Sequence, residues 1–287
     1  MKAEHLKDYR FNTGETNESL REKYNPEGSQ MREIQNRLLA MLIYLKEVCV
    51  QLGISYYIDG GTLLGAVRHG GFIPWDDDLD IVVDSKDIKR LSSYLKNHPH
   101  PRYFFMDRKT DSGYFNGWPK LVDKYSTSDY HGIYQGTKNH KNSVNHKGVS
   151  VDIFPYSDHV IPWINKILHG FHKRIIVRYL VGHYKILANC FSGLTFYVCK
   201  PIANLLGQLF CSKKIIAHDY CSVNTVHHFL KDAVYPLSVI SFEGYEFSAP
   251  KDCDYYLRSL YEDYMCLPPE SERHHHDLSY VLYPYDE

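Results

Sequence analysis

Residues 57–83 read YIDGGTLLGAVRHGGFIPWDDDLDIVV, and this stretch decides the fold. The mostly apolar run at residues 54–59 predicts a strand that leads into a turn at Gly60 and Gly61. Residues 62–68 predict a short helix, and a second glycine pair and a proline then force a loop. The DLDIVV run at residues 78–83 predicts a second strand. The predicted order is strand, glycine pair, short helix, loop and acidic strand.

The second strand carries two acids at alternate positions. Because alternate side chains of a strand share a face, Asp78 and Asp80 are expected to point the same way, with Leu79 and Ile81 on the other face. Two carboxylates on one face repel each other, and a divalent cation removes that penalty. Mg²⁺ takes oxygen ligands, usually one or two carboxylates together with substrate phosphates. Asp78 and Asp80 are therefore candidate metal ligands, and a solvated acidic turn is the alternative.

A later predicted strand supplies one more acid. Residues 149–154 (VSVDIF) form an apolar run whose one acid is Asp152, and burying that carboxylate is costly unless it is paired or bound to a metal. An aspartate at a strand edge that faces solvent is the alternative. The nucleotidyltransferase fold has the same layout. In that fold a strand, a glycine pair and a helix precede a strand with a D-x-D pattern, and a third acid comes from a later strand. The sequence thus predicts an α+β fold with a nucleotidyltransferase-like mixed sheet flanked by helices.

The composition limits the class of protein. The 287 residues are 44% hydrophobic and 23% charged, which indicates a folded chain of one large domain or two small ones. The formal charge of −1 gives no basic excess, so no nucleic-acid partner is expected. The seven cysteines are an odd number scattered along the chain, which suits reduced thiols better than a disulfide framework, and the first 30 residues contain no apolar leader run. Both observations favour a cytoplasmic location.

Residues 159–218 differ in composition from the rest of the chain. They contain no Asp or Glu and eight Lys or Arg residues. The apolar runs at 186–199 and 201–212 are each shorter than the ~18 residues needed to span a bilayer, and only Lys200 separates them. The segment predicts a basic, mainly helical insertion. Peripheral contact with an anionic membrane, at its inner face, is one interpretation. A membrane hairpin and a cluster of helices that happens to be basic are the others.

The domain organisation is expected to have four parts. The core begins with a helix predicted at residues 31–52, where apolar side chains recur every three or four positions, and Gly53 is expected to end it. The parts are a polar N-terminal arm at 1–28, a nucleotidyltransferase-like core at 29–158, the basic insertion at 159–218, and a C-terminal part at 219–287 that completes the core domain.

Four segments resemble the LicD family, which includes the fukutin-related proteins. The most specific is DGGTLLGAVRHGGFIPWDDDLDI at residues 59–81. WPKLVD at residues 118–123 and VDIFPY at residues 151–156 resemble two further family elements, and residues 251–269 resemble the C-terminal element. Glu262 departs from the family pattern, which usually has glycine at that position.

The resemblance implies a metal-dependent phosphotransferase of the class that transfers substituted phosphate groups. Relatives move phosphocholine, phosphoribitol or a similar group from a CDP-linked donor to a sugar hydroxyl. The acceptor is a glycan or lipid-linked glycan of the cell surface, such as lipopolysaccharide, capsule or teichoic acid. Carried over position by position, Asp78, Asp80 and Asp152 are the catalytic and metal-binding residues, with Mg²⁺ or Mn²⁺ as the cofactor. Asp152 is the candidate for assisting deprotonation of the acceptor hydroxyl.

Four further residues are candidates for binding the phosphates of the donor. Gly60 and Gly61 let backbone N–H groups approach a phosphate closely. Arg68 and Lys120 are candidate phosphate cations, and arginine can bind phosphate with two parallel hydrogen bonds. Ordinary surface or helix-end charge is the alternative for both cations.

Two other functions fit the same residues. A nucleotidyltransferase that uses an NTP and transfers NMP to a sugar phosphate or another acceptor would need the same three carboxylates. The long glycine-rich context around residues 60–75 favours the LicD-like interpretation over this one. A non-catalytic glycan- or membrane-binding protein is the second alternative, and the presence of all three acids argues against it.

Overall fold

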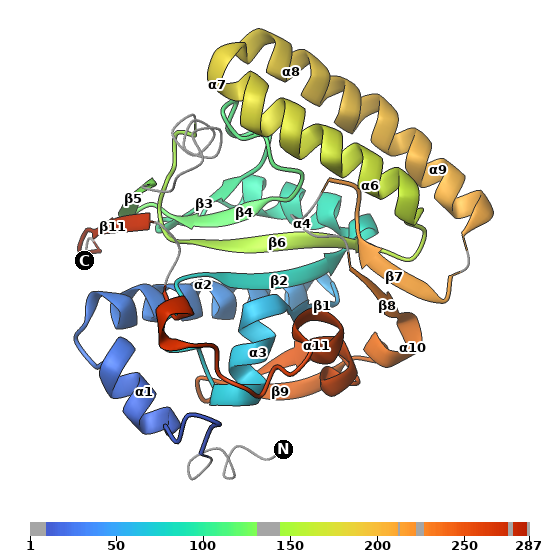
Figure 1. Cartoon of the computed structure of the whole chain (residues 1–287). Helices are drawn as coiled ribbons and strands as arrows, with labels where there is room; N and C mark the ends of the chain where they lie inside the picture. Colours follow the sequence, from blue (N-terminus) through green and yellow to red (C-terminus); the bar gives the residue numbers. More distant parts are fainter. Residues whose placement is uncertain (1–9, 131–143, 212, 222–226, 275–277, 286–287) are drawn as a thin grey trace. The chain divides into compact units, whose positions relative to one another are not determined.

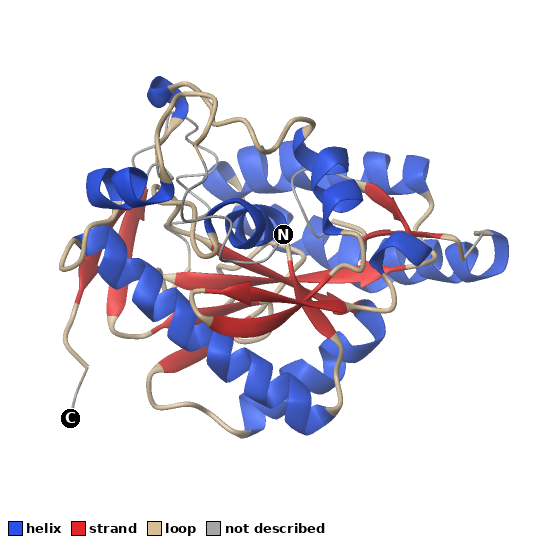
Figure 2. Ribbon diagram, turned by 90° about the horizontal axis from the view of Figure 1, so that it is seen from below, coloured by secondary structure: helices blue, strands red, loops and turns tan. Residues whose placement is uncertain are grey.

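A computed structural model describes residues 10–130, 144–211, 213–221, 227–274 and 278–285 of the chain. The chain divides into two compact units: Met1–Val82 with Asp232–His276, and Val83–Lys231 with Asp277–Glu287. Strands and flanking helices make up both units, which confirms the predicted α+β class with a mixed sheet (Figure 2). The four-part domain organisation predicted from the sequence remains a prediction.

The first unit is built around a long helix and two short strands. Its elements are α1 (Asn17–Tyr24), α2 (Gln30–Leu52), β1 (Tyr56–Ile58), α3 (Gly60–His69), the start of β2 (Leu79–Asp84), most of α10 (Lys231–Val234), β9 (Ser238–Phe242), β10 (Tyr245–Ala249), α11 (Cys253–Tyr261) and η4 (Glu270–Glu272). Strand β10 pairs antiparallel with β9 and lies beside β1, and α3 packs against α11 (Figure 1).

Helix α2 follows from its sequence. The side chain of Ser29 accepts a hydrogen bond from the N–H of Arg32 at its start, and Gly53 ends it in the left-handed conformation at φ 61°. Its apolar stripe is buried, which confirms the predicted helix over residues 31–52. The segment expected to be a polar arm contains α1, whose Leu20 is fully buried because it packs into the unit.

The second unit contains a sheet in which β6 is central. Its strands and the first of its helices are α4 (Ser85–Asn97), β3 (Tyr103–Met106), β4 (Lys120–Asp123), β5 (Ser126–Tyr130), β6 (Ser150–Ser157), β7 (Ile215–His218), β8 (His228–Leu230) and β11 (Leu278–Leu282). Strand β4 pairs antiparallel with both β3 and β6, β6 pairs with β7, and β7 with β8. Strands β5 and β11 form a separate antiparallel pair.

The basic insertion of the second unit is mainly helical, as predicted, and its helices form a hairpin (Figure 1). Its first limb is α6 (Pro162–Phe171), the π-helical segment η2 (His172–Leu180) and α7 (Val181–His183). Its second limb is α8 (Lys185–Leu194), the π-helical segment η3 (Thr195–Cys199) and α9 (Lys200–Phe210). Within the described part of the chain, Lys185–Phe210 is the one helical stretch that is long and apolar enough to cross a membrane by length and composition.

Candidate active site

The first turn of α3 lies against two carboxylates of the first unit. Asp59 is the N-cap of α3 and the glycine pair forms its first two residues, so the predicted turn at Gly60 and Gly61 is wrong: the pair begins the helix. Gly60 has φ 51°, and a Cβ there would lie 3.2 Å from Oδ2 of Asp80. A Cβ on Gly61 would lie 2.9 Å from Oδ2 of Asp76. Glycine is what allows this close approach, and the positive end of the helix dipole stabilises the nearby acids.

The backbone of Asp80 is fixed to the start of α3. Asp78 and Asp80 are half-buried, and the apolar side chains that alternate with them are fully buried, as the strand pattern predicted. The N–H of Asp80 donates to Oγ1 of Thr62 over 2.9 Å. The N–H of Asp59 donates to the carbonyl oxygen of Asp80 over 3.0 Å. These two bonds hold the acidic strand against the N-terminus of the helix.

Two tyrosines of α11 reach the carboxylates around the start of α3. The hydroxyl of the buried Tyr256 donates to Oδ1 of Asp59 over 2.6 Å. The hydroxyl of Tyr261 lies where a Cβ on Gly60 would approach it to 3.6 Å. Four carboxylates act on this hydroxyl: those of Asp59, Asp80, Asp76 and Asp78. Tyr261 is 42% exposed as a whole, but its hydroxyl end is buried. This burial, and then the neighbouring carboxylate charges, raise the pKa of Tyr261 well above its ordinary value. The hydroxyl therefore stays neutral and can donate a hydrogen bond.

Sequence reasoning assigned no role to Tyr256 or Tyr261. Both lie in residues 251–269, the segment that resembles the C-terminal family element, and that resemblance was the available signal. What the sequence lacked was the packing of α11 on α3, which brings the two hydroxyl groups to the acids.

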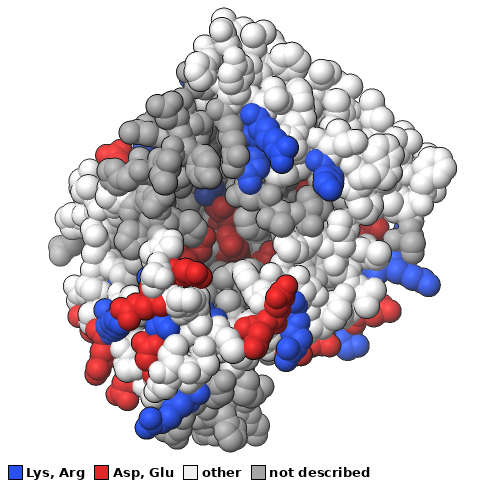
Figure 3. Space-filling view, in the orientation of Figure 1, with Lys and Arg blue, Asp and Glu red and all other residues white. Residues whose placement is uncertain are grey.

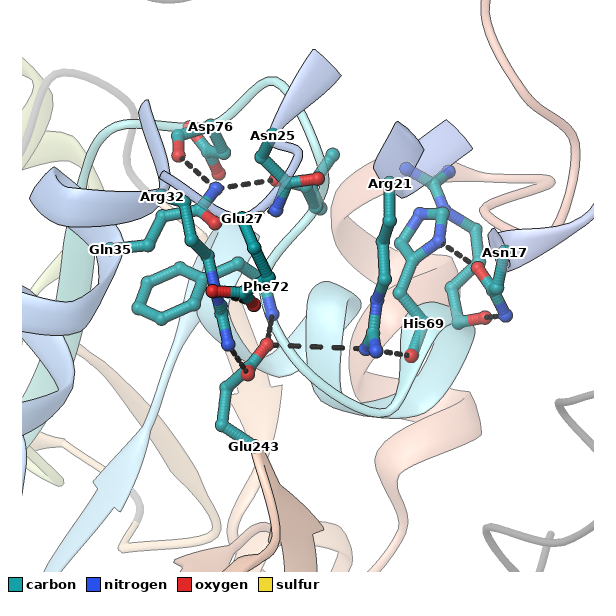
Figure 4. Close-up of polar contacts among 12 residues, drawn as sticks. Asn17, Arg21, Asn25, Glu27, Arg32, Gln35, His69, Phe72, Asp76 and Glu243 are labelled. Carbon is teal, nitrogen blue, oxygen red and sulfur yellow. Dashed lines mark hydrogen bonds and ion pairs between the residues drawn. The ribbon is translucent and has the colours of Figure 1, made fainter. Parts of the chain in front are cut away.

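A buried glutamine holds the loop that precedes β2. Nε2 of Gln35 donates to the carbonyl oxygen of Asp76 over 3.0 Å and to that of Ile73 over 3.4 Å. Its Oε1 accepts a hydrogen bond from Nδ2 of Asn25 over 2.6 Å (Figure 4). Because Gln35 is fully buried, these bonds are shielded from water and position the acidic loop from α2.

Glu243, in the turn between β9 and β10, holds the corner after α3. Its Oε1 accepts the N–H of Phe72 over 3.0 Å, and its Oε2 accepts from Nη2 of Arg32 over 2.9 Å (Figure 4). Nη2 of Arg21 lies 4.0 Å from Oε1. The Glu243 side chain is only 7% exposed, and the two arginines compensate its buried charge inside the unit.

Arg68 is a buried clamp between α3 and the chain that follows α11. It is 4% exposed, and Nη1 donates to the carbonyl oxygens of Tyr264 over 2.9 Å and Cys266 over 3.4 Å. Its Nε donates to Nε2 of His69 over 2.9 Å. Burial lowers the pKa of Arg68 to about 10. The binding of donor phosphate by Arg68 remains a prediction, and these contacts do not favour it.

In the second unit, Asp152 is held by a lysine and a tryptophan. Lys120 on β4 lies directly opposite Asp152 on β6, and its Nζ is 2.5 Å from Oδ1. Nε1 of Trp118 donates to Oδ2 of Asp152 over 3.0 Å. Lys120 is thus already paired with a carboxylate, and its role as a phosphate cation remains a prediction. The contact of Trp118 depends on the strand register, which the sequence did not reveal.

The candidate site residues divide between the two units. Gly60, Gly61, Arg68, Asp78 and Asp80 belong to the first unit, and Lys120 and Asp152 to the second. Among the described residues, no three His, Cys, Asp or Glu side chains are gathered as a ligand set for a metal ion. The metal-binding and catalytic roles of Asp78, Asp80 and Asp152 therefore remain predictions.

Comparison with known proteins identifies the central part of the chain. Residues 53–178 match the family model described as LicD/FKTN/FKRP, nucleotidyltransferase domain. This match, together with the relative described next, supports membership of the LicD family. The resemblance to LicD is thereby confirmed for the three segments at residues 59–81, 118–123 and 151–156, and the matched range includes Asp78, Asp80 and Asp152.

One LicD-family relative matches along nearly the whole chain. The lipopolysaccharide cholinephosphotransferase LicD of Haemophilus influenzae is 26% identical over 278 residues, which cover 88% of this chain and 98% of the relative. The ribitol 5-phosphate transferase FKRP of Homo sapiens is 44% identical over 45 residues, 16% of this chain and 9% of the relative. An uncharacterized protein of Rickettsia prowazekii is 51% identical over 49 residues, 17% of this chain and 18% of the relative.

Proposed function

We propose that this LicD-family chain is a phosphotransferase that moves a phospho-alcohol group from a CDP-linked donor to a sugar hydroxyl of a glycan. Phosphocholine and phosphoribitol are the candidate groups. The names of two relatives, a lipopolysaccharide cholinephosphotransferase and a ribitol 5-phosphate transferase, support the transferase class. The first of these names supports a cell-surface glycan as the acceptor.

The observation that carries the proposal is the gathering of carboxylates at the first turn of α3. Asp76 and Asp80 lie against Gly61 and Gly60, and Asp59 is the N-cap of the same helix. Carboxylates that lie close together favour the binding of positive charge beside them. Phosphoryl transfer depends mainly on neutralising and positioning charged oxygens, so this cluster is suited to that chemistry.

A divalent cation is the proposed cofactor, because hard cations such as Mg²⁺ and Mn²⁺ prefer carboxylate oxygens. Asp78, Asp80 and Asp152 are the ligands that the resemblance to LicD implies for it. When bound, the cation would neutralise charge on the phosphates of the donor.

The chain's own groups supply the rest of the proposed reaction. The N–H groups of Gly60 and Gly61 lie in the first turn of α3, where helix N–H groups have no partner within the helix and can bind phosphate oxygens. The neutral hydroxyl of Tyr261 can donate one more hydrogen bond there. Asp152, oriented by Trp118, would accept the proton of the sugar hydroxyl. A bond forms from that sugar oxygen to phosphorus, the bond to the CMP oxygen breaks, and CMP leaves.

An NTP-dependent nucleotidyltransferase is the second candidate, because the matched family model describes a nucleotidyltransferase domain. The two reactions release different products. A CDP-alcohol donor yields CMP, whereas an NTP that transfers NMP yields pyrophosphate. The choice between them can therefore be measured directly.

The test is a donor screen with purified protein, Mg²⁺ and a bacterial glycan extract. CDP-choline, CDP-ribitol, CDP-glycerol and NTPs are compared, with CMP and pyrophosphate as readouts. We expect CMP from one CDP-alcohol, and Asp78→Asn and Asp80→Asn should each lower the rate by at least about 10³-fold. Glu47→Gln, an exposed carboxylate on α2, is the matched control and should keep the wild-type rate.

Each outcome of the screen has a distinct meaning. Pyrophosphate from an NTP would establish the alternative function. Wild-type rates in both aspartate variants would overturn the assigned site. If no donor reacts, calorimetric binding of each donor decides, and absence of binding to every CDP-alcohol would reject the donor class. The predicted cytoplasmic location and the contact of residues 159–218 with a membrane are separate parts of the proposal, which this screen does not address.

A further inference from the structure

The second limb of the hairpin in the second unit turns its small side chains inward. The buried residues of α8, η3 and α9 are Ala188, Ser192, Thr195, Ala203 and Gly207. They recur at helical spacing, so they share one face of the limb. This is the reverse of an ordinary surface helix, whose large apolar side chains face the core.

The inward face has its partners within the second unit. Ala188 packs in a cluster with Phe115 and Ile176, and Ala203 packs in a cluster with Val160 and Tyr220. Gly207 lies so close to the carbonyl oxygen of His159 that a Cβ would overlap it. The limb is therefore fixed to the unit by close backbone approach, and no large side chain of its own is needed there.

The outward face of the same limb is made of large apolar side chains. Ile186, Tyr197, Leu205, Leu209 and Phe210 are between 57% and 80% exposed. On the first limb, Trp163 is 65% exposed and Ile167 61% exposed. A soluble surface rarely presents such a contiguous apolar stripe unless it contacts a partner or a membrane.

Charge is excluded from this stripe and gathered at its borders. Lys200, the one charged residue between 186 and 210, turns inward, and its Nζ lies 2.9 Å from Oδ2 of Asp219, which is 3% exposed. Exposed cations flank the stripe: Lys166, Arg174, Lys185, Lys213 and Lys214. In Figure 3 the surface over α8 and α9 is white, whereas basic side chains gather over the first limb.

We propose that the hairpin is a membrane-docking surface that lies in the interface of an anionic bilayer. The apolar stripe enters the boundary of the acyl chains, and the flanking cations contact lipid phosphates. A second copy docked hairpin to hairpin is a poorer occupant, because residues 159–218 contain no acid to complement those cations. The hairpin lies on the bilayer and does not cross it, since its inward face is already packed against the unit.

The test is flotation of the full chain with vesicles of phosphatidylcholine that contain phosphatidylglycerol, beside vesicles of phosphatidylcholine alone. We expect binding to the anionic vesicles, and the double variant Leu205→Gln, Leu209→Gln should lower the partition coefficient at least about tenfold. Lys213→Gln with Lys214→Gln should lower it about tenfold on anionic vesicles only. The matched control is Val50→Gln with Val239→Gln, which replaces exposed apolar side chains of the first unit and should bind as the wild type does.

Tryptophan emission locates the contact. Trp163 is exposed on α6, so its emission should shift to the blue on addition of anionic vesicles, and Trp163→Phe should abolish the shift. Absence of binding by the wild type, or equal binding by the Leu205→Gln, Leu209→Gln variant, would overturn the proposal. A lipid-free dimer in light scattering that this variant dissociates would assign the stripe to a second copy instead. None of these readouts depends on the donor or on catalytic activity.

Discussion

The hydroxyl of Tyr256 donates a hydrogen bond to Oδ1 of Asp59 over 2.6 Å, across 197 positions of sequence. Asp59 is the N-cap of α3, and its side chain makes no capping hydrogen bond. Tyr256 is fully buried on α11. The bond therefore joins α11 to the first turn of α3, which lies against the carboxylates of Asp76 and Asp80.

Replacing this hydroxyl tests how strongly the two helices are coupled. Tyr256→Phe keeps the ring and removes a donor to a buried carboxylate, so we expect a loss of about 1.5–3 kcal/mol in the free energy of unfolding, measured in urea. Tyr245→Phe removes the hydroxyl of a half-exposed tyrosine on β10 and should change the free energy of unfolding by less than about 0.5 kcal/mol. Equal effects of the two variants would contradict the coupling.

Trp118 is expected to orient the carboxylate that accepts the proton. Trp118→Phe removes the N–H that binds Oδ2 of Asp152 but keeps an aromatic ring beside Phe154. The hydrogen bond is made to a charged group, so its loss should lower kcat about 10–100-fold. The KM for the donor should change little, because the side chain positions a proton acceptor.

The control for Trp118→Phe is Trp163→Phe assayed with a soluble acceptor, which should keep the wild-type kcat because Trp163 lies on the exposed face of the hairpin. Steady-state kinetics of CMP release separates the two parameters. A higher KM at unchanged kcat in Trp118→Phe would instead place the tryptophan in donor binding.

Glu262 stands in a backbone conformation that suits glycine. It follows α11 with φ 53° and ψ −107°, and such strain at a residue with a side chain costs of order 1–3 kcal/mol. Glycine loses roughly 0.5–1 kcal/mol more conformational entropy on folding, so Glu262→Gly should stabilise the chain by about 1 kcal/mol. Glu262→Ala keeps the Cβ and should leave the free energy of unfolding nearly unchanged. A destabilised Glu262→Gly variant in urea would show that the position carries no strain.

The backbone conformation at position 262 thus explains why glycine is usual there in the LicD family. Glu262 departs from that pattern, and the backbone strain that it causes can be measured. The acids of β2 were equally accessible to sequence reasoning. A period of two puts Asp78 and Asp80 on one face, and burial of the alternating residues confirms it. Local patterns of this kind depend only on residues that are neighbours in the sequence, so they can be predicted from a single sequence.

Contacts between distant segments were not accessible in the same way. The pairing of Lys120 with Asp152 depends on the register of β4 and β6, and the burial of Arg68 depends on where the chain after α11 packs. Gly60 was expected in a turn because a glycine pair usually breaks structure, whereas close packing on Asp80 keeps it in a helix. The inward turn of Lys200 likewise needs Asp219, which lies in a later segment.

His69 makes the stability of the first unit depend on pH. It is 3% exposed, its Nδ1 lies 2.5 Å from Oδ1 of Asn17, and its Nε2 accepts from Nε of Arg68 (Figure 4). These partners fit a neutral ring that carries its proton on Nδ1. Burial, and then the charges of Arg68 and Arg21, hold the pKa of His69 well below its ordinary value. The unfolded chain therefore binds a proton that the folded chain does not.

The sign of the pH dependence follows from that difference. Above about pH 6.5, the ordinary pKa of histidine, the contribution of His69 is fully present, and it is lost as the pH falls toward the lowered folded pKa. In that window the free energy of unfolding should fall by up to about 1.4 kcal/mol per pH unit because of this residue. His69→Gln cannot titrate there, so its urea unfolding between about pH 7 and pH 5 should show a correspondingly shallower slope than the wild type. His98→Gln, at an exposed histidine on the C-terminal cap of α4, should keep the wild-type slope, and equal slopes for His69→Gln and the wild type would contradict a neutral, buried His69.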